Sequence, residues 1–353
     1  MLELPDDFLM RLYNLRKKYR NVGLSVKNKE IKIKQLESRF MKDITSHHII
    51  LESIIEKWIF RKITSSIDQV ISDFDGVIYH ISTPETKTKM LISMRIRCYA
   101  SLVKYNALTV LERYYGKMIV SPENKYDFSL CIDLETLSDD EKEKNDLIRS
   151  IGLLKRNMLA APFEMAFMQQ ELLAKEQESA KETINKVGEV MEIPYREEEA
   201  IFIIPSFDRV TVIFSTIFRE ETDRIIGKVF LQEFVDARRR PAIQNAPQVL
   251  YSYRDPPLEI QALKNSNRCE NIGYVTFVLF PQHYTPEKRE NCITKIQLFR
   301  NTLHYHIKAS KAHMHGRMRA RVTAFLKVLN RAKLENPEKE KKTASGRSFV
   351  ISK

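Results

Sequence analysis

The residues with the clearest catalytic potential lie in the string Asp73-Phe74-Asp75-Gly76-Val77. Two aspartates separated by one residue can divide the work of phosphoryl transfer, with the first as nucleophile and the second as general acid and base. This chemistry also needs a magnesium ion to hold the phosphate. It further requires the first aspartate to stand at the C-terminal end of a buried parallel strand, so the neighbouring sequence decides whether the chemistry is available.

The surrounding sequence disfavours a phosphatase of the haloacid-dehalogenase type, whose Asp-x-Asp-Gly-Val motif this string is similar to. The preceding run at 67–72 is barely apolar, and the following run at 77–82 continues as a strand instead of opening a loop. The next acidic pair, Asp139 and Asp140, falls at a helix start rather than at a strand end. We therefore predict a turn or bulge at a strand edge around Asp73 and Asp75, and a chain that is not an enzyme, with the phosphatase as the weaker alternative.

Four histidines form a second candidate site, because two HxH pairs follow each other at His304, His306, His313 and His315. On a helix, residues two apart diverge by about 200°, and residues seven apart lie roughly 10 Å apart along the axis. No pair can therefore chelate one ion, and we predict no metal site. The four cysteines are widely spaced without a CxxC pair, and no Walker loop, GxGxxG or GxSxG motif is present, so we expect no cofactor.

The histidines belong to an element at 286–334 whose pattern predicts one continuous amphipathic helix. Its apolar residues recur at steps of three, four or seven, an average of about 3.67 residues per turn. Pro286 suits a helix start, Pro337 lies just beyond the end, and only Gly316 interrupts the pattern. The apolar stripe consists of Ile296, Phe299, Leu303, Ile307, Met314, Met318, Val322, Phe325 and Leu329.

This helix is longer than a single domain can cover. It measures about 70 Å at about 1.5 Å per residue, whereas a compact domain of about 100 residues is roughly 35 Å across. Each large apolar side chain gains about 1.5 to 3 kcal/mol on full burial, so an overhanging stripe predicts a partner surface. We therefore assign the nine stripe residues to a partner-helix interface.

The same helix and the tail after it carry the charge of the chain. Residues 286–353 hold 17 Lys and Arg against 5 Asp and Glu, and this net +12 equals the net charge of the whole chain. The basicity is therefore local and indicates one acidic partner surface. A nucleic-acid-binding module is the alternative, because phosphate contacts need only Lys and Arg. No RNP aromatics, zinc-finger spacing or helix-turn-helix pattern accompanies these residues, so we expect no nucleic acid.

The chain as a whole predicts the α+β class, with two tandem domains that each consist of an antiparallel sheet with helix cover. Its 353 residues, 43% of them apolar, are enough to bury a sizeable core. The predicted parts are a basic N-terminal extension at 1–46, a first domain at 47–170, a charged linker at 171–192, and a second domain with the long helix and a basic tail at 193–353. No apolar run approaches about 18 residues, so we expect no membrane span.

Seven strings in a fixed order make the chain resemble the subunit 2 family of the actin-related protein 2/3 complex, the assembly that nucleates branched actin filaments. The strings lie at 73–82, 153–157, 208–218, 226–234, 246–260, 270–281 and 299–332. The resemblance extends from about Ile49 to Lys353 and leaves 1–46 outside. It transfers nothing to 171–198, where this chain is longer and more charged than its family.

The resemblance implies a cytoplasmic, non-catalytic scaffold of the actin cytoskeleton. The long C-terminal helix would pair with subunit 4, and the chain would help to hold the two actin-related subunits and contact the side of the mother actin filament. An acidic filament suits the basic face of the helix, on which four basic residues point away from the stripe and two flank it. We therefore assign filament contact to Lys308, Arg319, Lys327 and Arg331, flanked by Arg317 and Arg321.

Overall fold

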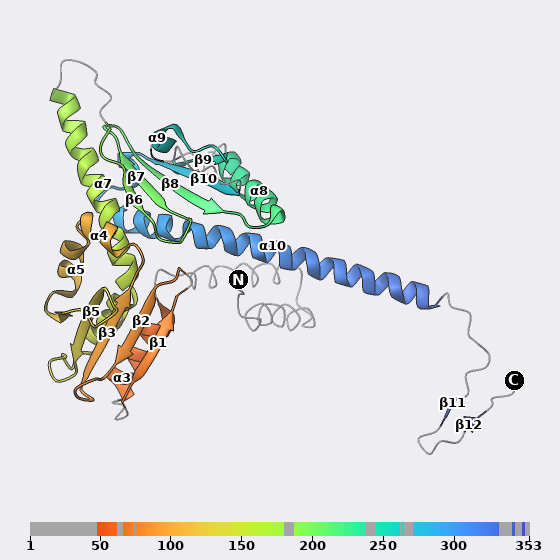
Figure 1. The fold of residues 1–353 in the computed structure, drawn as a ribbon, viewed down its shortest axis with the longest axis horizontal. Helices are drawn as coiled ribbons and strands as arrows, with labels where there is room; N and C mark the ends of the chain where they lie inside the picture. The colour runs from red at the N-terminus through yellow and green to blue at the C-terminus, as the bar shows by residue number, and fades with distance from the viewer. Residues whose placement is uncertain are drawn as a thin grey trace. The chain divides into compact units, whose positions relative to one another are not determined.

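The computed structural model describes residues 48–61, 66–73, 75–179, 187–237, 245–261, 263, 271–331, 341–342 and 348–349 (Figure 1). The extension predicted at 1–46 lies outside the described residues. The chain divides into two compact units, one that ends at His304 and one from Tyr305 to Lys353. The first unit contains both five-stranded sheets.

The first sheet consists of antiparallel strands in the spatial order β1-β2-β3-β5-β4. Its strands are β1 (Asp68–Ser72), β2 (Ile78–Ser82), β3 (Lys89–Arg95), β4 (Ile119–Val120) and β5 (Phe128–Asp133). The register places Ile81 opposite Ile92 and Ile92 opposite Leu130, and all three side chains are fully buried. Because side chains alternate along a strand, the other face carries the intervening polar residues. Ser93 and Ser129 meet there, with their hydroxyls 2.9 Å apart.

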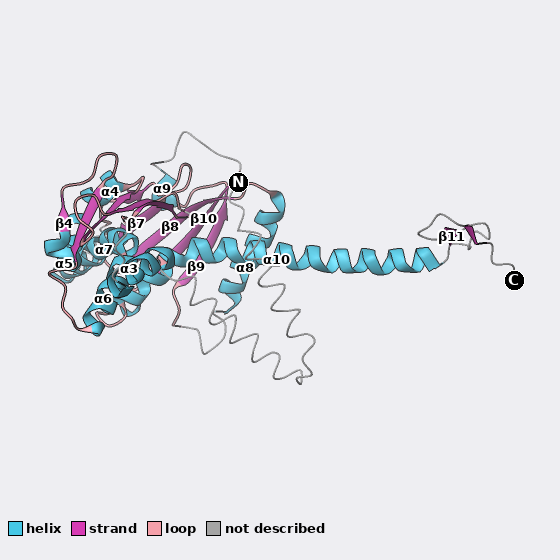
Figure 2. Ribbon diagram, turned by 90° about the horizontal axis from the view of Figure 1, so that it is seen from below, coloured by secondary structure: helices cyan, strands magenta, loops and turns pink. Residues whose placement is uncertain are grey.

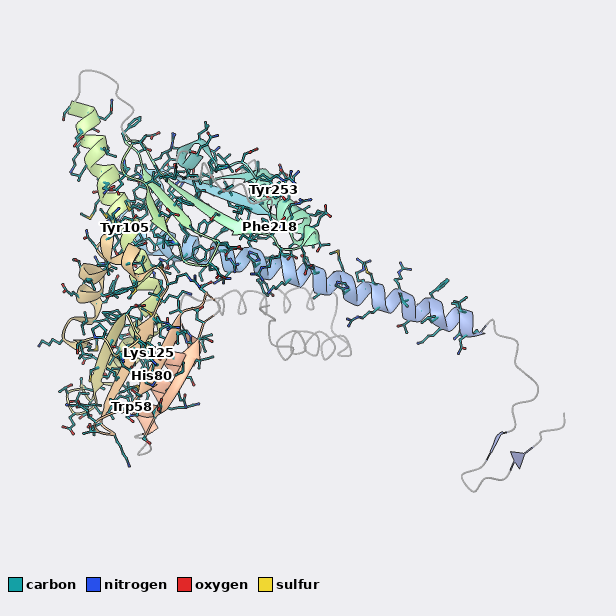
Figure 3. All side chains as sticks on the ribbon, viewed as in Figure 1. Trp58, His80, Tyr105, Lys125, Phe218 and Tyr253 are labelled. Carbon is teal, nitrogen blue, oxygen red and sulfur yellow. The ribbon has the colours of Figure 1, made fainter. Side chains whose placement is uncertain are left out.

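The helices of this half are α3 (Ile49–Arg61), α4 (Tyr99–Lys104), α5 (Ala107–Tyr115), η1 (Gly116–Met118), α6 (Glu141–Gly152) and α7 (Leu154–Ser179). Helix α3 buries Trp58, whose indole Nε1 donates to the Lys87 carbonyl at 3.2 Å (Figure 3). Helix α6 is capped by Asp140, whose carboxylate accepts the Lys142 N–H at 3.0 Å. The acidic pair at 139–140 is therefore a helix start, as predicted.

Helix α7 connects the two sheets, because it contacts α5 in the first half and β7 and β8 in the second. Near its C-terminal end, Gln170 donates to the Phe207 carbonyl at 2.9 Å and accepts the Tyr284 hydroxyl at 2.8 Å. The segment predicted as a charged linker, 171–192, contains the last turns of α7 and the start of β6, and its residues 180–186 lie outside the described part.

The second sheet repeats the strand order of the first, with three sequential strands followed by the fifth and then the fourth, β6-β7-β8-β10-β9. Its strands are β6 (Met191–Ile193), β7 (Ile201–Pro205), β8 (Val210–Ile217), β9 (Gln248–Tyr253) and β10 (Ile272–Leu279). The associated helices are α8 (Glu221–Ala237), α9 (Leu258–Gln261) and η3 (Pro281–His283). Helix α8 contacts β9, and both lie at one end of this sheet (Figures 1 and 2).

The two faces of the second sheet have separate cores. On one face the rings of Phe214 and Phe277 lie 5.5 and 4.6 Å from the ring of Phe299, which belongs to helix α10 (Arg289–Arg331). On the other face a cluster around Phe202 packs against Ile260 of α9. Both faces are thus covered, and β8 and β10 are buried along almost their whole length.

These elements confirm the predicted α+β class, with two antiparallel sheets, helix cover and a long C-terminal helix. Helix α10 is continuous over 43 residues, and the predicted positions 332–334 lie outside the described residues. Beyond it, β11 (Lys341–Lys342) pairs with β12 (Ser348–Phe349) in antiparallel register. Among the described helices, none is long and apolar enough to cross a membrane.

Candidate partner interface on the C-terminal helix

Helix α10 forms over 43 residues because its sequence contains no proline and is rich in strong helix formers. Its one glycine, Gly316, costs about 1 kcal/mol relative to alanine at a helix-interior position. A Cβ built at Gly316 meets no atom within 4 Å, so packing within this chain does not require the glycine. The helix therefore passes through this position without local support from its own chain.

The first part of the predicted stripe is buried in the chain itself. Four of the nine residues assigned to a partner interface are at most 6% exposed: Ile296, Phe299, Leu303 and Ile307. These four are consequently not available to a partner, and that part of the prediction was wrong. The 3.6-residue period reports that one face of a helix is buried, and it carries no information on whether the burying surface belongs to the same chain.

The second part of the stripe is exposed. Met314, Met318, Val322, Phe325 and Leu329 have between 44% and 64% of their surface accessible. Two further large apolar residues, Leu326 and Val328, are equally exposed and were missed because the predicted stripe took a single residue per turn. Leu326 lies four residues after Val322, which was the available signal. Seven exposed apolar side chains within 16 residues form a continuous patch of the kind that marks a binding surface.

The basic residues occupy the remainder of the same exposed segment. Five of the six assigned to filament contact are exposed, namely Arg317, Arg319, Arg321, Lys327 and Arg331, while Lys308 is half-buried. Lys327 and Arg331 each lie two residues from Leu329 and therefore about 160° around the helix from it. Measured from Leu329, Arg319 and Arg321 lie about 80° around the helix on opposite sides, so Arg319 flanks the end of the stripe rather than pointing away from it. No Asp or Glu occurs from 291 to 331, so no carboxylate on the helix neutralises this face.

The histidines of α10 do not converge. His304 is half-buried and stacks on Phe218 with 6.1 Å between ring centroids, whereas His313 and His315 are exposed. Across the part of the chain that the structure covers, no group of three or more His, Cys, Asp or Glu side chains is arranged to hold a metal ion.

The aspartates of the phosphatase-like string form a turn between β1 and β2. The Asp73 N–H donates to the Val77 carbonyl at 2.8 Å, and the Asp75 N–H donates to Asp73 Oδ1 at 2.6 Å. Gly76 adopts a φ of +76°, which a residue with a side chain rarely adopts. The string is therefore the turn at a strand edge that the sequence predicts.

Both carboxylates are already engaged by cations. Lys155 Nζ on α7 lies 2.5 Å from Asp73 Oδ2 and also bonds Asp75 Oδ2, while Arg196 Nη2 lies 2.5 Å from Asp75 Oδ1. Burial alone would raise the pKa of Asp75, but the charges of Lys155 and Arg196 outweigh it and hold the pKa well below its usual range. Burial would lower the pKa of Lys155, yet Asp75 and Asp73 raise it above its ordinary value. A carboxylate whose pKa is held this low between two cations is poorly suited to act as a general acid, and Asp73, the candidate nucleophile, is itself paired with Lys155.

Comparison with known proteins identifies the family. Residues 92–336 match the family model described as "Arp2/3 complex, 34 kD subunit p34-Arc". The chain belongs to the p34-Arc family. It is 56% identical over 318 residues, 88% of this chain and 99% of the relative, to the "Actin-related protein 2/3 complex subunit 2" of Schizosaccharomyces pombe. It is 38% identical over 285 residues, 80% of this chain and 91% of the relative, to the protein of the same name from Dictyostelium discoideum.

Membership of the p34-Arc family confirms the resemblance drawn from the seven strings. The family consists of non-catalytic complex subunits, which also confirms the prediction that this chain is not an enzyme. The haloacid-dehalogenase alternative is thereby removed, in agreement with the pairing of Asp73 and Asp75. The exposed segment of α10 carries seven large apolar side chains that this chain itself does not cover.

Proposed function

We propose that this chain is the scaffold subunit of an actin-related protein 2/3 complex that binds subunit 4 through the exposed segment of α10. The observation that carries the proposal is the exposure of Met314, Met318, Val322, Phe325 and Leu329 on one face of a single helix. Fully burying such side chains gains about 1.5 to 3 kcal/mol each, which a facing helix with its own apolar stripe supplies. The two actin-related subunits are the next partners of this scaffold.

The basic face of the same helix gives the chain a second partner, the side of the mother actin filament. Lys327 and Arg331 face away from the stripe, so they remain accessible when a partner helix covers it. Individual exposed ion pairs contribute about 0 to 1 kcal/mol, but several cations on one rigid helix act together and steer an acidic target. With this contact the chain supports branched actin nucleation, and its place is the cytoplasmic actin cytoskeleton.

The subunit contact is tested by Met318→Asp in the full chain co-expressed with subunit 4. A new carboxylate in the covered stripe is buried without a partner or forces the helices apart, so co-purification of subunit 4 should fall at least tenfold. Ala320→Asp is the matched control, because it adds the same charge two residues away on the opposite face and should leave co-purification intact. Equal recovery of subunit 4 with both variants would show that the stripe does not bind it.

The filament contact is separated from the nucleic-acid alternative by co-sedimentation of the assembled complex with actin filaments, with and without competing RNA. Binding to the filament should persist in the presence of RNA at physiological salt and decline as salt is raised, because the Debye length is only about 8 Å at 0.15 M. Tight, length-dependent binding of RNA by the intact complex, with loss of filament binding, would favour the nucleic-acid module instead.

A further inference from the structure

The aspartates of the β1–β2 turn belong to a larger network of charged side chains. Six residues alternate in sign along it, and the side chain of each is at most 19% exposed: Asp73, Lys155, Asp75, Arg196, Glu199 and Arg300. Three are anions and three are cations, so the network is neutral as a whole. Networks of this kind are stable only when every member is paired, because an unpaired buried charge is costly.

Each inner member of the network is shared by two neighbours. Lys155 joins Asp73 to Asp75, and Arg196 joins Asp75 to Glu199 with Nη2 2.5 Å from Asp75 Oδ1 and Nε 3.7 Å from Glu199 Oε2. At the far end Arg300 donates to both oxygens of Glu199, from Nε at 2.9 Å and from Nη2 at 3.2 Å. Asp75 and Arg300 themselves share no hydrogen bond or ion pair.

The network joins four segments of the first compact unit. Asp75 stands in the β1–β2 turn of the first sheet and Lys155 on the first turn of α7. Glu199 lies in the β6–β7 loop of the second sheet, where it also accepts the Ile217 N–H at 3.0 Å, and Arg300 lies on α10. The ends of the network thus belong to the first sheet and to the helix that carries the partner surface.

We propose that this network couples the β1–β2 turn to α10, so that a charge lost at Asp75 is compensated by a charge lost at Arg300 although the two residues do not touch. Removing Asp75 alone leaves one cation in excess, and removing Arg300 alone leaves one anion in excess. Removing both leaves two simple pairs, Lys155 with Asp73 and Arg196 with Glu199. This coupling is independent of the subunit contact proposed above, because it resides entirely within residues 73–300.

The test is a double-mutant cycle in the full chain with Asp75→Asn and Arg300→Gln, followed by urea unfolding. Each single variant should lower the urea midpoint. If the two substitutions acted independently, their effects on the unfolding equilibrium constant would multiply. The double variant should instead have an unfolding equilibrium constant about tenfold smaller than that product. Strict additivity of the two substitutions would overturn the proposal.

Two further double-mutant cycles serve as controls. Asp208→Asn removes a carboxylate that pairs with Arg209 at the surface, outside the network, and should combine additively with Arg300→Gln. Lys155→Met combined with Arg300→Gln removes two charges of the same sign, so the double variant should lose at least the sum of the two single losses in unfolding free energy.

If Asp75→Asn fails to fold, Asp73→Asn replaces it in the main cycle, because Asp73 bonds only one cation of the network. Compensation by Arg300→Gln is still expected. Additivity in that substitute cycle would equally overturn the coupling.

Discussion

Arg156 on α7 and Glu290 on α10 form an ion pair, with 2.6 Å between Nη1 and Oε2, across 134 positions of sequence. The Arg156 side chain is only 4% exposed, and its other nitrogens donate to the Glu290 carbonyl at 2.8 Å and to Thr294 Oγ1 at 3.0 Å. One guanidinium therefore joins the helix that connects the sheets to the start of the helix that carries the partner surface. The planar, five-donor shape of arginine allows Arg156 to bind these acceptors together with Asn157 Oδ1 at 3.2 Å.

We predict that Arg156→Met lowers the free energy of unfolding by about 1 to 3 kcal/mol, because it removes several charge-assisted hydrogen bonds from a buried site. Arg156→Lys should recover only part of the loss, since an ammonium cannot reproduce the planar fork. Urea unfolding followed by circular dichroism measures both. Arg331→Met, at an exposed position of the same long helix, is the control and should leave stability within about 0.5 kcal/mol of the wild type. A loss in Arg331→Met as large as that in Arg156→Met would contradict the role assigned to this pair.

The surroundings of His80 make the first sheet sensitive to pH. His80 on β2 lies between two carboxylates, with Nδ1 2.8 Å from Glu123 Oε2 and Nε2 2.9 Å from Asp68 Oδ1, and its ring stacks on Tyr126 (Figure 3). Burial lowers the pKa of His80, but the hydrogen bonds that its ring donates to Glu123 and Asp68 outweigh burial and raise the pKa above the ordinary 6.5. The charged imidazolium on β2 thus bonds both the edge strand β1, through Asp68, and the β4–β5 turn, through Glu123.

Because the folded pKa exceeds the unfolded value, the stability that His80 contributes is fully present below pH of about 6.5 and is lost as pH rises through the folded pKa. We predict that wild type exceeds His80→Gln in unfolding free energy most clearly below pH 6.5, by about 1 kcal/mol, and that the difference shrinks at alkaline pH. The single tryptophan, Trp58, reports unfolding of this half by fluorescence. His315→Gln, exposed on α10, should show no such trend. If the difference in unfolding free energy between wild type and His80→Gln did not change with pH, the charged imidazolium would not be the form that stabilises the sheet.

The sequence predicted what local patterns encode. The run at 77–82 continues as strand β2, Asp140 caps a helix start, and the period of α10 located its apolar face except for Leu326 and Val328. The same patterns placed Ile296 and Phe299 on a partner surface, because periodicity identifies a buried face without saying which chain buries it. Only the three-dimensional register, which sets Phe299 against Phe214 and Phe277, separates the two cases.

The charged network could not be read from the sequence at all. Lys155, Arg196 and Arg300 are distributed over helices and a loop at separations with no local period, and each is an ordinary surface residue by composition. Their partners become evident only when the β1–β2 turn, α7, the β6–β7 loop and α10 meet. Lys155 and Arg156 are adjacent basic residues in the sequence, but the structure pairs them with Asp73, Asp75 and Glu290. They are therefore not available to an acidic partner, whereas Arg317, Arg319, Arg321, Lys327 and Arg331 of α10 are exposed.

The proposed filament contact leads to a prediction about the basic residues on the outer side of α10. Reversing Arg319, Lys327 and Arg331 together to glutamate should weaken filament binding and branching by the assembled complex several-fold, because the acidic filament would then face like charge. Assembly with subunit 4 should persist, since Lys327 and Arg331 point about 160° away from Leu329. A double variant that reverses only Lys327 and Arg331 separates the effect of these two outward-facing residues from that of Arg319, which lies at the rim of the stripe. Filament co-sedimentation and branching assays of purified complex measure the effect.

The matched control reverses three exposed basic residues of the first half, Arg97, Lys117 and Lys125, which changes the net charge by the same amount at another surface. If the effect depends on the face of α10 rather than on net charge, the control should retain more filament binding than the α10 triple variant at every salt concentration. The difference between the two should narrow as ionic strength rises, because exposed charges are screened beyond about 8 Å at 0.15 M and about 3 Å at 1 M. Normal branching by a fully assembled α10 triple variant would place the filament contact elsewhere on the complex.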